Sequence, residues 1–152
     1  MSTRPFADMV NRMIRGELPP APIAETIGMR CVEVRPDFAA FEMEASRRHA
    51  NPMGTLHGGI LCDVADAAMG MAFASALEEG ESFTTLELKI NFLRPVWNST
   101  LRATARLVSG GRTVGMMECD VTDEQGRLVA RASSTCMTLR GDKVSGREVG
   151  AG

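Results

Sequence analysis

Residues Asn51–Gly70 read NPMGTLHGGILCDVADAAMG, and the other predicted elements are arranged around them. A polar, turn-prone loop leads to the pair Gly58-Gly59, and an apolar segment then continues to about Leu77. Small and aliphatic side chains recur in that segment at the spacing of a helix with one strongly buried face: Leu61, Val64, Ala65, Ala68 and Ala72. The stretch therefore predicts a loop that leads into one long, buried helix.

The glycine pair Gly58-Gly59 is predicted to form the N-terminal end of this helix, which we call the helix mouth. The first N–H groups of a helix have no partner within it, and glycine lets another molecule approach them closely. The positive end of the helix dipole lies at the same place. Such a mouth suits a carbonyl oxygen that gains negative charge during a reaction.

Asp66 is the carboxylate that stands out on the helix, because a charge among alanines and methionines costs free energy unless it is used or paired. It lies about 12 Å along the axis from Gly58, so one helix cannot bring Asp66 to its own glycine mouth. Two antiparallel copies related by a two-fold axis can do so. The residues alone leave a second interpretation open, in which Asp66 pairs with an arginine or faces water.

Length and composition describe an ordinary globular protein. A chain of 152 residues suits one domain with a sizeable core. A formal net charge of −2 gives no electrostatic footprint for nucleic acid or for an anionic membrane. No apolar run approaches the roughly 20 residues that a membrane span needs, because Asp63 and Asp66 interrupt the best candidate. No signal-peptide core is visible at the N-terminus.

The cysteines are widely spaced, lie in apolar contexts and form no C-x-x-C pair: Cys31, Cys62, Cys119 and Cys136. We interpret them as reduced, buried thiols of a cytoplasmic protein. With 2 histidines in the chain, no cluster of metal ligands is visible, and no nucleotide-phosphate loop is present. We therefore expect neither a metal nor another cofactor.

The segments before the central helix predict one helix and two strands. Apolar residues recur at helical spacing from Phe6 to Ile14. Residues 1–20 are therefore interpreted as an N-terminal helix and its connector. Residues 23–28 suit a single helical turn, and residues 29–34 and 38–45 suit strands. Residues 47–49, Arg-Arg-His, are interpreted as a solvated loop edge.

The segments after the helix predict four strands. Residues 84–93 alternate with a two-residue period, which places Thr85 on the face opposite Leu86 and Leu88. Further strands are predicted at 101–108, 113–121 and 128–139, and the tail 141–152 is predicted to be disordered. A buried helix needs a surface around it, so this order predicts an α+β domain with a curved antiparallel sheet around the long helix.

An ordered set of residues resembles the hotdog-fold acyl-CoA thioesterases, and within them the phenylacetate-degradation type. The set consists of Asn51, Gly54, His57-Gly58-Gly59, Asp66, Thr85 and Pro95. The resemblance extends over residues 23–139. It implies a single hotdog domain over residues 1–140 and a homodimer with shared sites, arranged as a dimer of dimers. The implied reaction is hydrolysis of an acyl-CoA or aryl-CoA thioester.

The resemblance also implies roles for single residues. The amide of Gly58 would polarise the thioester carbonyl, and Asn51 would help to hold the carbonyl or a water molecule. Asp66 would act as general base or as nucleophile. Thr85 would orient the water, although a threonine in a strand is by itself unremarkable. His57 is expected to position the loop or the substrate rather than to act as the base.

Further candidates for substrate binding surround this set. Gly59 belongs to the helix mouth, and Asp63 lies one helical turn before Asp66 as an auxiliary or structural group. For the phosphates of coenzyme A the candidates are arginines: Arg112 in the turn at 110–113, with Arg94 and Arg140 behind it.

Two other functions stay open at the level of the sequence. A hotdog hydratase or dehydratase would use a dyad of His57 with a carboxylate. A non-catalytic module would bind acyl-CoA without cleaving it, although the set of Asn51, Asp66 and Thr85 argues against that function. Release of thiol from an acyl-CoA separates the first function from the other two.

Overall fold

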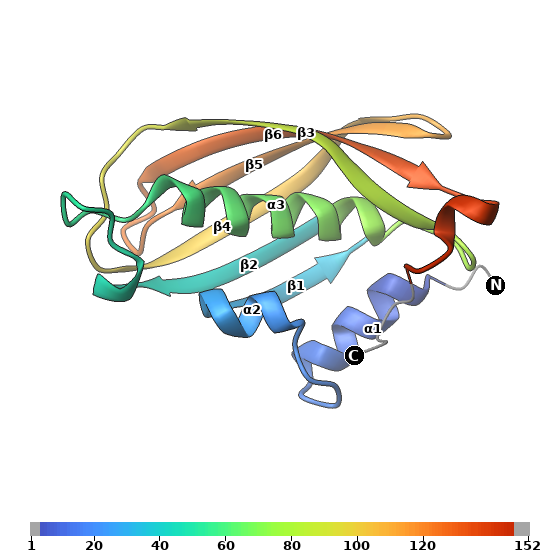
Figure 1. Cartoon of the computed structure of the whole chain (residues 1–152), viewed down its shortest axis with the longest axis horizontal. Helices are drawn as coiled ribbons and strands as arrows, with labels where there is room; N and C mark the ends of the chain where they lie inside the picture. The colour runs from blue at the N-terminus through green and yellow to red at the C-terminus, as the bar shows by residue number, and fades with distance from the viewer. Residues whose placement is uncertain (1–3, 148–152) are drawn as a thin grey trace.

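The predicted central helix is present as the longest helix of the described chain. The structure is a computed structural model, and it describes residues 4–147. Figure 1 shows the sheet curving around this helix, α3. The helices are α1 (Pro5–Ile14), α2 (Pro22–Ile27) and α3 (Gly58–Ala74), with short 3-10 helices η1 (Arg47–His49) and η2 (Gly141–Val144). The strands are β1 (Met29–Arg35), β2 (Phe38–Ala45), β3 (Ser82–Phe92), β4 (Ser99–Gly110), β5 (Val114–Thr122) and β6 (Leu128–Leu139).

The buried face of α3 consists of the side chains that were predicted from their helical spacing. Each is 4% exposed or less: Leu61, Val64, Ala65, Ala68 and Ala72. Alanines dominate this face, so the sheet approaches the helix closely, and β2, β4 and β5 all contact it. The predicted architecture, a long helix enclosed by a curved antiparallel sheet, is confirmed.

The sheet has the strand order β1-β2-β4-β5-β6-β3, and every neighbouring pair is antiparallel. Three consecutive hairpin-connected strands, β4 to β6, form its centre. The strand β3 follows α3 in the chain, crosses to the far side and pairs only with β6 among the described strands. It is therefore an edge strand, and its second edge is open to a partner.

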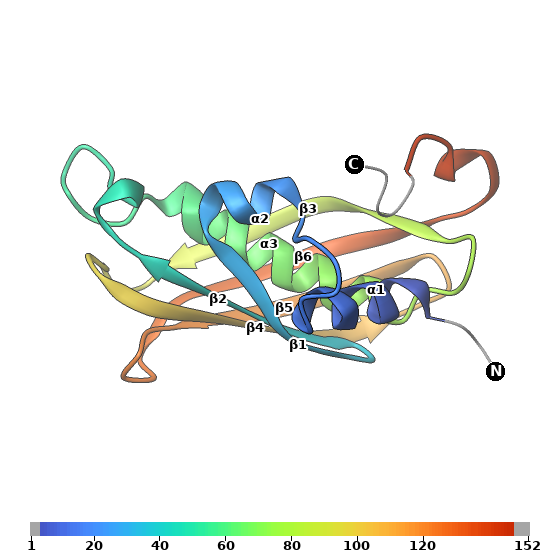
Figure 2. The same cartoon turned by 90° about the horizontal axis from the view of Figure 1, so that it is seen from below.

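The N-terminal helices pack against the β1 edge of the sheet. Figure 2 shows α1 and α2 beside β1, the other edge of the sheet. The predicted stripe of α1 is confirmed, with Phe6 and Val10 buried. The ring of Phe6 also reaches β3, where it meets Phe83 edge-on at a centroid distance of 6.1 Å. This helix thus supports the strand that carries part of the site described below.

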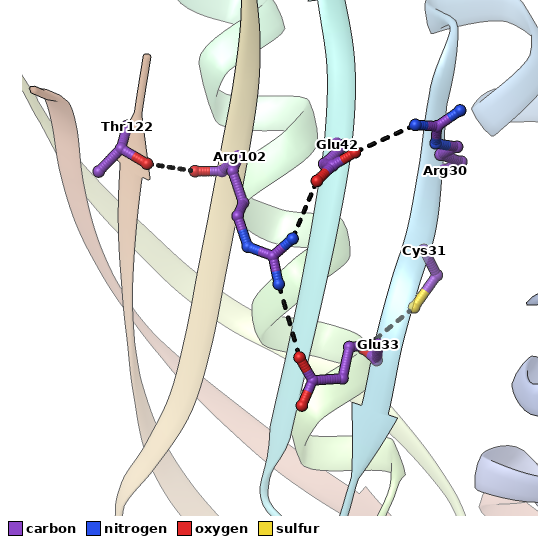
Figure 3. A network of polar contacts seen from close by, with 6 residues as sticks. All are labelled: Arg30, Cys31, Glu33, Glu42, Arg102 and Thr122. Carbon is purple, nitrogen blue, oxygen red and sulfur yellow. Dashed lines mark hydrogen bonds and ion pairs between the residues drawn. The ribbon is translucent and has the colours of Figure 1, made fainter. Parts of the chain in front are cut away.

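The outer face of the sheet is a ladder of ion pairs. Figure 3 shows Glu42 on β2 between Arg30 on β1 and Arg102 on β4, with nitrogen–oxygen distances of 3.1 and 2.9 Å. The hydrogen bond from Arg30 is the main reason why the pKa of Glu42 is lowered. Exposed pairs of this kind each stabilise a fold by at most about 1 kcal/mol. The ladder keeps the outer face polar, while the apolar side chains face α3.

Two predictions about segments outside the strands and the long helices differ from the structure. His49, predicted at a solvated loop edge, is buried: its Nδ1 accepts the N–H of Ser46 at 3.2 Å, and its Nε2 donates to the carbonyl of Ile27 at 2.8 Å. Residues 141–147, predicted to be disordered, begin with η2, and Arg147 donates to the carbonyl of Phe83. The remainder of the predicted tail, 148–152, lies outside the described residues.

Within residues 4–147 no helix has the length and apolar character needed to cross a membrane.

One close contact positions β3 on α3. A Cβ atom built on Gly70 would lie 3.2 Å from two atoms of the Phe83 ring. That ring is confined between Phe6 and Phe73, at centroid distances of 6.1 and 5.9 Å. It therefore has little room to retreat from a larger residue at position 70. Gly70 is the position where the strand rests on the helix.

We predict that Gly70→Ala destabilises the protein, although alanine in a helix interior normally stabilises it by about 1 kcal/mol relative to glycine. Overpacking costs about 1–3 kcal/mol, so a net loss of about 1 kcal/mol is expected in urea unfolding. In a Phe83→Leu background the ring is gone, and the same substitution should become stabilising. A Gly70→Ala variant that is more stable than the parent in both backgrounds would show that the contact is not tight.

Candidate functional site

A register shift in β3 decides where Thr85 points. In the pairing with β6, Thr85 lies opposite Cys136 and Glu87 lies opposite Thr135, so Leu86 has no partner in the ladder. This bulge reverses the alternation. Thr85 therefore shares the helix-facing side with Leu88, and the prediction that the two lie on opposite faces is wrong. Leu86 is instead 53% exposed.

Thr85 and Asp66 form the centre of the candidate site. The Thr85 hydroxyl donates to Oδ1 of Asp66 over 3.1 Å. The strand brings the hydroxyl there because Phe83, two residues earlier on the same face, rests on Gly70, one helical turn after Asp66. Asp66 is exposed in the single chain and has no ion-pair partner among the described residues. Within one chain Asp66 therefore pairs with no arginine, and its exposure agrees with the other part of the second interpretation, in which it faces water.

Asp63 lies one helical turn before Asp66 and faces the same cavity. Its pKa is raised, first by burial and then by the negative charge of Asp66, whereas His57 lowers it. Burial is also the main reason why the pKa of Cys62 is raised, and both carboxylates add to it. A thiol with a raised pKa is a poor nucleophile. Cys62 is therefore disfavoured as a nucleophile at this turn of α3.

The helix mouth lies at the first turn of α3. The carbonyl of His57 accepts the first hydrogen bond from Ile60 at 3.0 Å, so the N–H groups of Gly58 and Gly59 have no acceptor within the helix. The ring of Phe92, at the end of β3, covers Gly58 so closely that a Cβ there would lie 2.8 Å from it. A Cβ at Gly59 would lie 3.2 Å from the His57 ring. A side chain at either position would therefore require the neighbouring ring to move.

Asn51 organises the loop before the helix. Its Oδ1 accepts the backbone N–H groups of Met53 and Thr55, at 2.9 and 3.2 Å. Its Nδ2 donates to the Thr55 hydroxyl at 2.9 Å. The predicted contact of Asn51 with a carbonyl or a water molecule stays a prediction. The second N–H of Nδ2 has no partner in residues 4–147 and is the part of the side chain that is free for this contact.

The buried ring of His49 supports the same loop and was missed by the sequence analysis. Its ring connects η1 to the end of α2, and its carbonyl accepts the N–H of His57 at 2.9 Å. A histidine that follows two arginines gives no local signal of burial. His49 therefore holds the helix mouth from behind, while His57 itself is exposed beside Gly59.

The predicted residues line two separate cavities on one chain. The first, of about 270 Å³, has Asp63, Asp66 and Thr85 in its wall. The second, of about 610 Å³, has the helix mouth in its wall: Asn51, His57, Gly58 and Gly59. Cys62 lines both cavities. The structure thus brings the candidates together as two halves, with the carboxylate in one and the free amides in the other.

The three candidate arginines lie in two places. Arg94 lines the cavity of the helix mouth. Arg112 and Arg140 line a third cavity, which also has Phe73 and Leu77 at the C-terminal end of α3 in its wall. Arg140 is engaged there, because it donates to Glu81 and to the carbonyl of Arg112, both at 2.7 Å. Within one chain, Arg94 is the candidate that lies beside Gly58.

Comparison with known families gives a match over most of this site. The model of the thioesterase superfamily matches residues 53–130, which run from the helix mouth into β6. A solved structure from Ralstonia eutropha JMP134, described as a phenylacetic acid degradation-related protein, is 35% identical, with a TM-score of 0.76. The match covers 84% of this chain and 98% of that chain. The predicted hotdog fold and the predicted family resemblance are confirmed.

Two relatives of this chain are named as enzymes that hydrolyse CoA thioesters. The 1,4-dihydroxy-2-naphthoyl-CoA hydrolase of Listeria monocytogenes is 29% identical over 113 residues, which cover 74% of this chain and 92% of the relative. Acyl-coenzyme A thioesterase 13 of Mus musculus is 27% identical over 106 residues, which cover 68% and 75% of the two chains.

We predict that Asp63→Asn stabilises the protein at neutral pH. A pKa that is higher in the folded than in the unfolded chain means that the charged carboxylate destabilises the fold. The asparagine lacks this charge, so its advantage should be full at pH 7. The advantage should vanish as the pH falls below the ordinary aspartate pKa of about 3.9, where both states are protonated. Urea unfolding across this pH range measures the difference.

Asp120 provides the opposite control. The hydrogen bond from Arg131 lowers its pKa, so Asp120→Asn should lose stability at pH 7 and lose progressively less as the pH falls. If Asp63→Asn lowers stability at pH 7, as Asp120→Asn is expected to do, the electrostatic assignment of Asp63 is wrong.

Proposed function

We propose that this chain, which belongs to the thioesterase superfamily, hydrolyses an acyl-CoA or aryl-CoA thioester to the free acid and coenzyme A. The observation that carries the proposal is the hydrogen-bonded pair of Thr85 and Asp66 in the wall of an open cavity. A carboxylate so held is suited to accept a proton from water. The curated relatives named above hydrolyse CoA thioesters according to their names.

In the proposed reaction a water molecule attacks the thioester carbonyl carbon while Asp66 accepts its proton. The N–H of Gly58 stabilises the oxyanion of the tetrahedral intermediate, because that amide has no acceptor within α3. The intermediate then collapses, the C–S bond breaks, and the thiolate of coenzyme A takes the proton from Asp66. A nucleophilic attack by Asp66 itself would form an acyl-enzyme anhydride instead, and labelled water incorporated into Asp66 would reveal that route.

We further propose that each complete site forms between two chains. The rise of an α-helix separates Gly58 from Asp66 by about 12 Å on one chain, and the two residues line different cavities. The free edge of β3 carries exposed apolar side chains, Leu86 and Phe92, at 53% and 55% exposure. Such an edge suits pairing with a second copy. A further association into a dimer of dimers stays a prediction from the family resemblance.

For the phosphates of coenzyme A, the placement favours Arg94 over Arg112. Arg94 lines the same cavity as Gly58 and has no ion-pair partner among the described residues. Arg112 lies at the opposite end of α3, next to an arginine that is already paired. The guanidinium of Arg94 is therefore the one that a substrate bound at the helix mouth of the same chain meets first.

The general experiment is a panel of acyl-CoA and aryl-CoA substrates followed by thiol release. Release of coenzyme A from at least one of them is expected. Hydration of an enoyl-CoA without thiol release would instead identify the hydratase function that His57 keeps open. Tight binding of acyl-CoA without either reaction would identify a binding module.

We predict that Asp66→Asn keeps the fold and loses about 10²–10⁴-fold in turnover, the usual contribution of a general base. Asp63→Asn is the matched control on the same helix and should lose clearly less, because Asp63 has no described hydrogen bond to Thr85. Turnover measured on the best substrate of the panel decides between them. If Asp66→Asn is active and Asp63→Asn is inactive, the roles assigned to Asp63 and Asp66 must be exchanged.

We predict that two inactive variants restore activity when their subunits exchange. One carries Gly58→Pro, which removes the amide donor, and the other carries Asp66→Asn. Because a side chain at position 58 would collide with the Phe92 ring, both variants are made in a Phe92→Ala parent whose activity is measured first. A heterodimer then has one site with both defects and one with neither. Up to half of the parent activity per heterodimer should return.

The control for this experiment is each variant mixed with itself, which should stay inactive. Subunit exchange is followed with two affinity tags, and folding by circular dichroism. If tagged heterodimers form and no activity returns, each site is built within one chain.

A further inference from the structure

A buried row of polar side chains continues behind the Asp66–Thr85 pair. Cys136 on β6 lies directly opposite Thr85, and its Sγ is 3.9 Å from the Thr85 hydroxyl. Ser134, two residues earlier on the same face of β6, has its hydroxyl 3.8 Å from that sulfur. Cys136 and Ser134 are both 0% exposed. The row runs from the sheet interior to the carboxylate in the cavity wall.

The hydrogens of this row can be assigned one after another. Thr85 has a single hydroxyl hydrogen, and it is used on Asp66. Towards Cys136, Thr85 therefore acts only as an acceptor, and the thiol must donate. The thiol also has a single hydrogen, so the hydroxyl of Ser134 must donate to the sulfur. All hydrogens then point from Ser134 through Cys136 and Thr85 towards Asp66.

We propose that Cys136 is a positioning residue, whose thiol holds the Thr85 hydroxyl in the orientation that points its hydrogen at Asp66. The inference deepens the proposed function, on which it rests, because it explains how the carboxylate is held for its reaction with water. Without the donor behind it, the Thr85 hydroxyl gains freedom to rotate about its C–O bond. Asp66 then loses a fixed donor.

The surroundings of Cys136 suit this role. Burial is the main reason why the pKa of its thiol is raised, so the sulfur keeps its hydrogen at neutral pH. The large sulfur also matters, because a separation of 3.9 Å is within reach of an S–H donor but well beyond the usual 2.7–2.8 Å of an O–H···O bond. Ser134 would otherwise be a buried hydroxyl without a partner among the described residues.

The test compares Cys136→Ala with Cys119→Ala by turnover of a thioester. Cys119 is an equally buried cysteine on β5, and its Sγ is near the carbonyl of Asp120 rather than near Thr85. Weak hydrogen bonds of this kind correspond to about a two- to fivefold change in rate. We expect Cys136→Ala to lower kcat by about this factor with KM unchanged, and Cys119→Ala to leave both unchanged.

A double-mutant cycle separates positioning from general packing. In a Thr85→Val background the hydroxyl is gone, so adding Cys136→Ala should not lower kcat further. An equal loss in both backgrounds, or an equal loss on Cys119→Ala, would overturn the inference. Thermal unfolding of each variant, and of Cys136→Val, which avoids the cavity, shows whether a change in kcat merely follows lost stability.

Infrared spectroscopy tests the same inference without any activity. The S–H stretching band that disappears in Cys136→Ala belongs to Cys136. It should shift to higher frequency in Thr85→Val, because the thiol loses its acceptor, and it should not shift in Cys119→Ala. A band that stays in place in Thr85→Val would overturn the inference. If the wild-type protein releases thiol from no substrate, the proposed function fails, but the band still decides whether the thiol holds Thr85.

Discussion

The contact on which the rest of the site depends is the one between β3 and α3 at Gly70. The Phe83 ring reaches the helix because position 70 has no side chain, and Phe6 and Phe73 confine the ring there. Thr85 lies two residues further along the strand, and Asp66 lies one turn back along the helix. The distance between hydroxyl and carboxylate is therefore set by apolar packing. An exposed polar pair alone contributes too little free energy to hold a strand in place.

The elements of the fold follow from periodicity, which is a local property. Side chains every three or four residues predicted α3 and α1, and alternation predicted the strands, with boundaries within a few residues of those observed. The bulge at Leu86 could not be predicted in this way. Leu86 continues the apolar alternation of the following residues, so nothing in the strand itself marks it as the residue without a partner. The pairing with β6, distant in the chain, makes that choice.

The candidate site was predictable where a residue carries its own chemistry. A glycine pair before an apolar segment and a carboxylate within it gave Gly58 and Asp66 directly. His49 and Cys136 were missed because their importance lies in what packs against them, which depends on contacts across the sheet. The candidate arginines were sorted only by the strand order, which places Arg94 at one end of α3 and Arg112 at the other.

The bulge separates two requirements on β3. Because Leu86 is exposed and outside the ladder, the packing of the single chain does not fix its side chain, and only the proposed pairing with a second copy would restrict it. The number of residues between Phe83 and Leu88, in contrast, is fixed. Losing one residue would restore a continuous alternation, and either the hydroxyl of Thr85 or the apolar half of the strand would turn outward. An insertion or deletion between residues 83 and 88 is therefore more disruptive to the site than a change of side chain at the bulge.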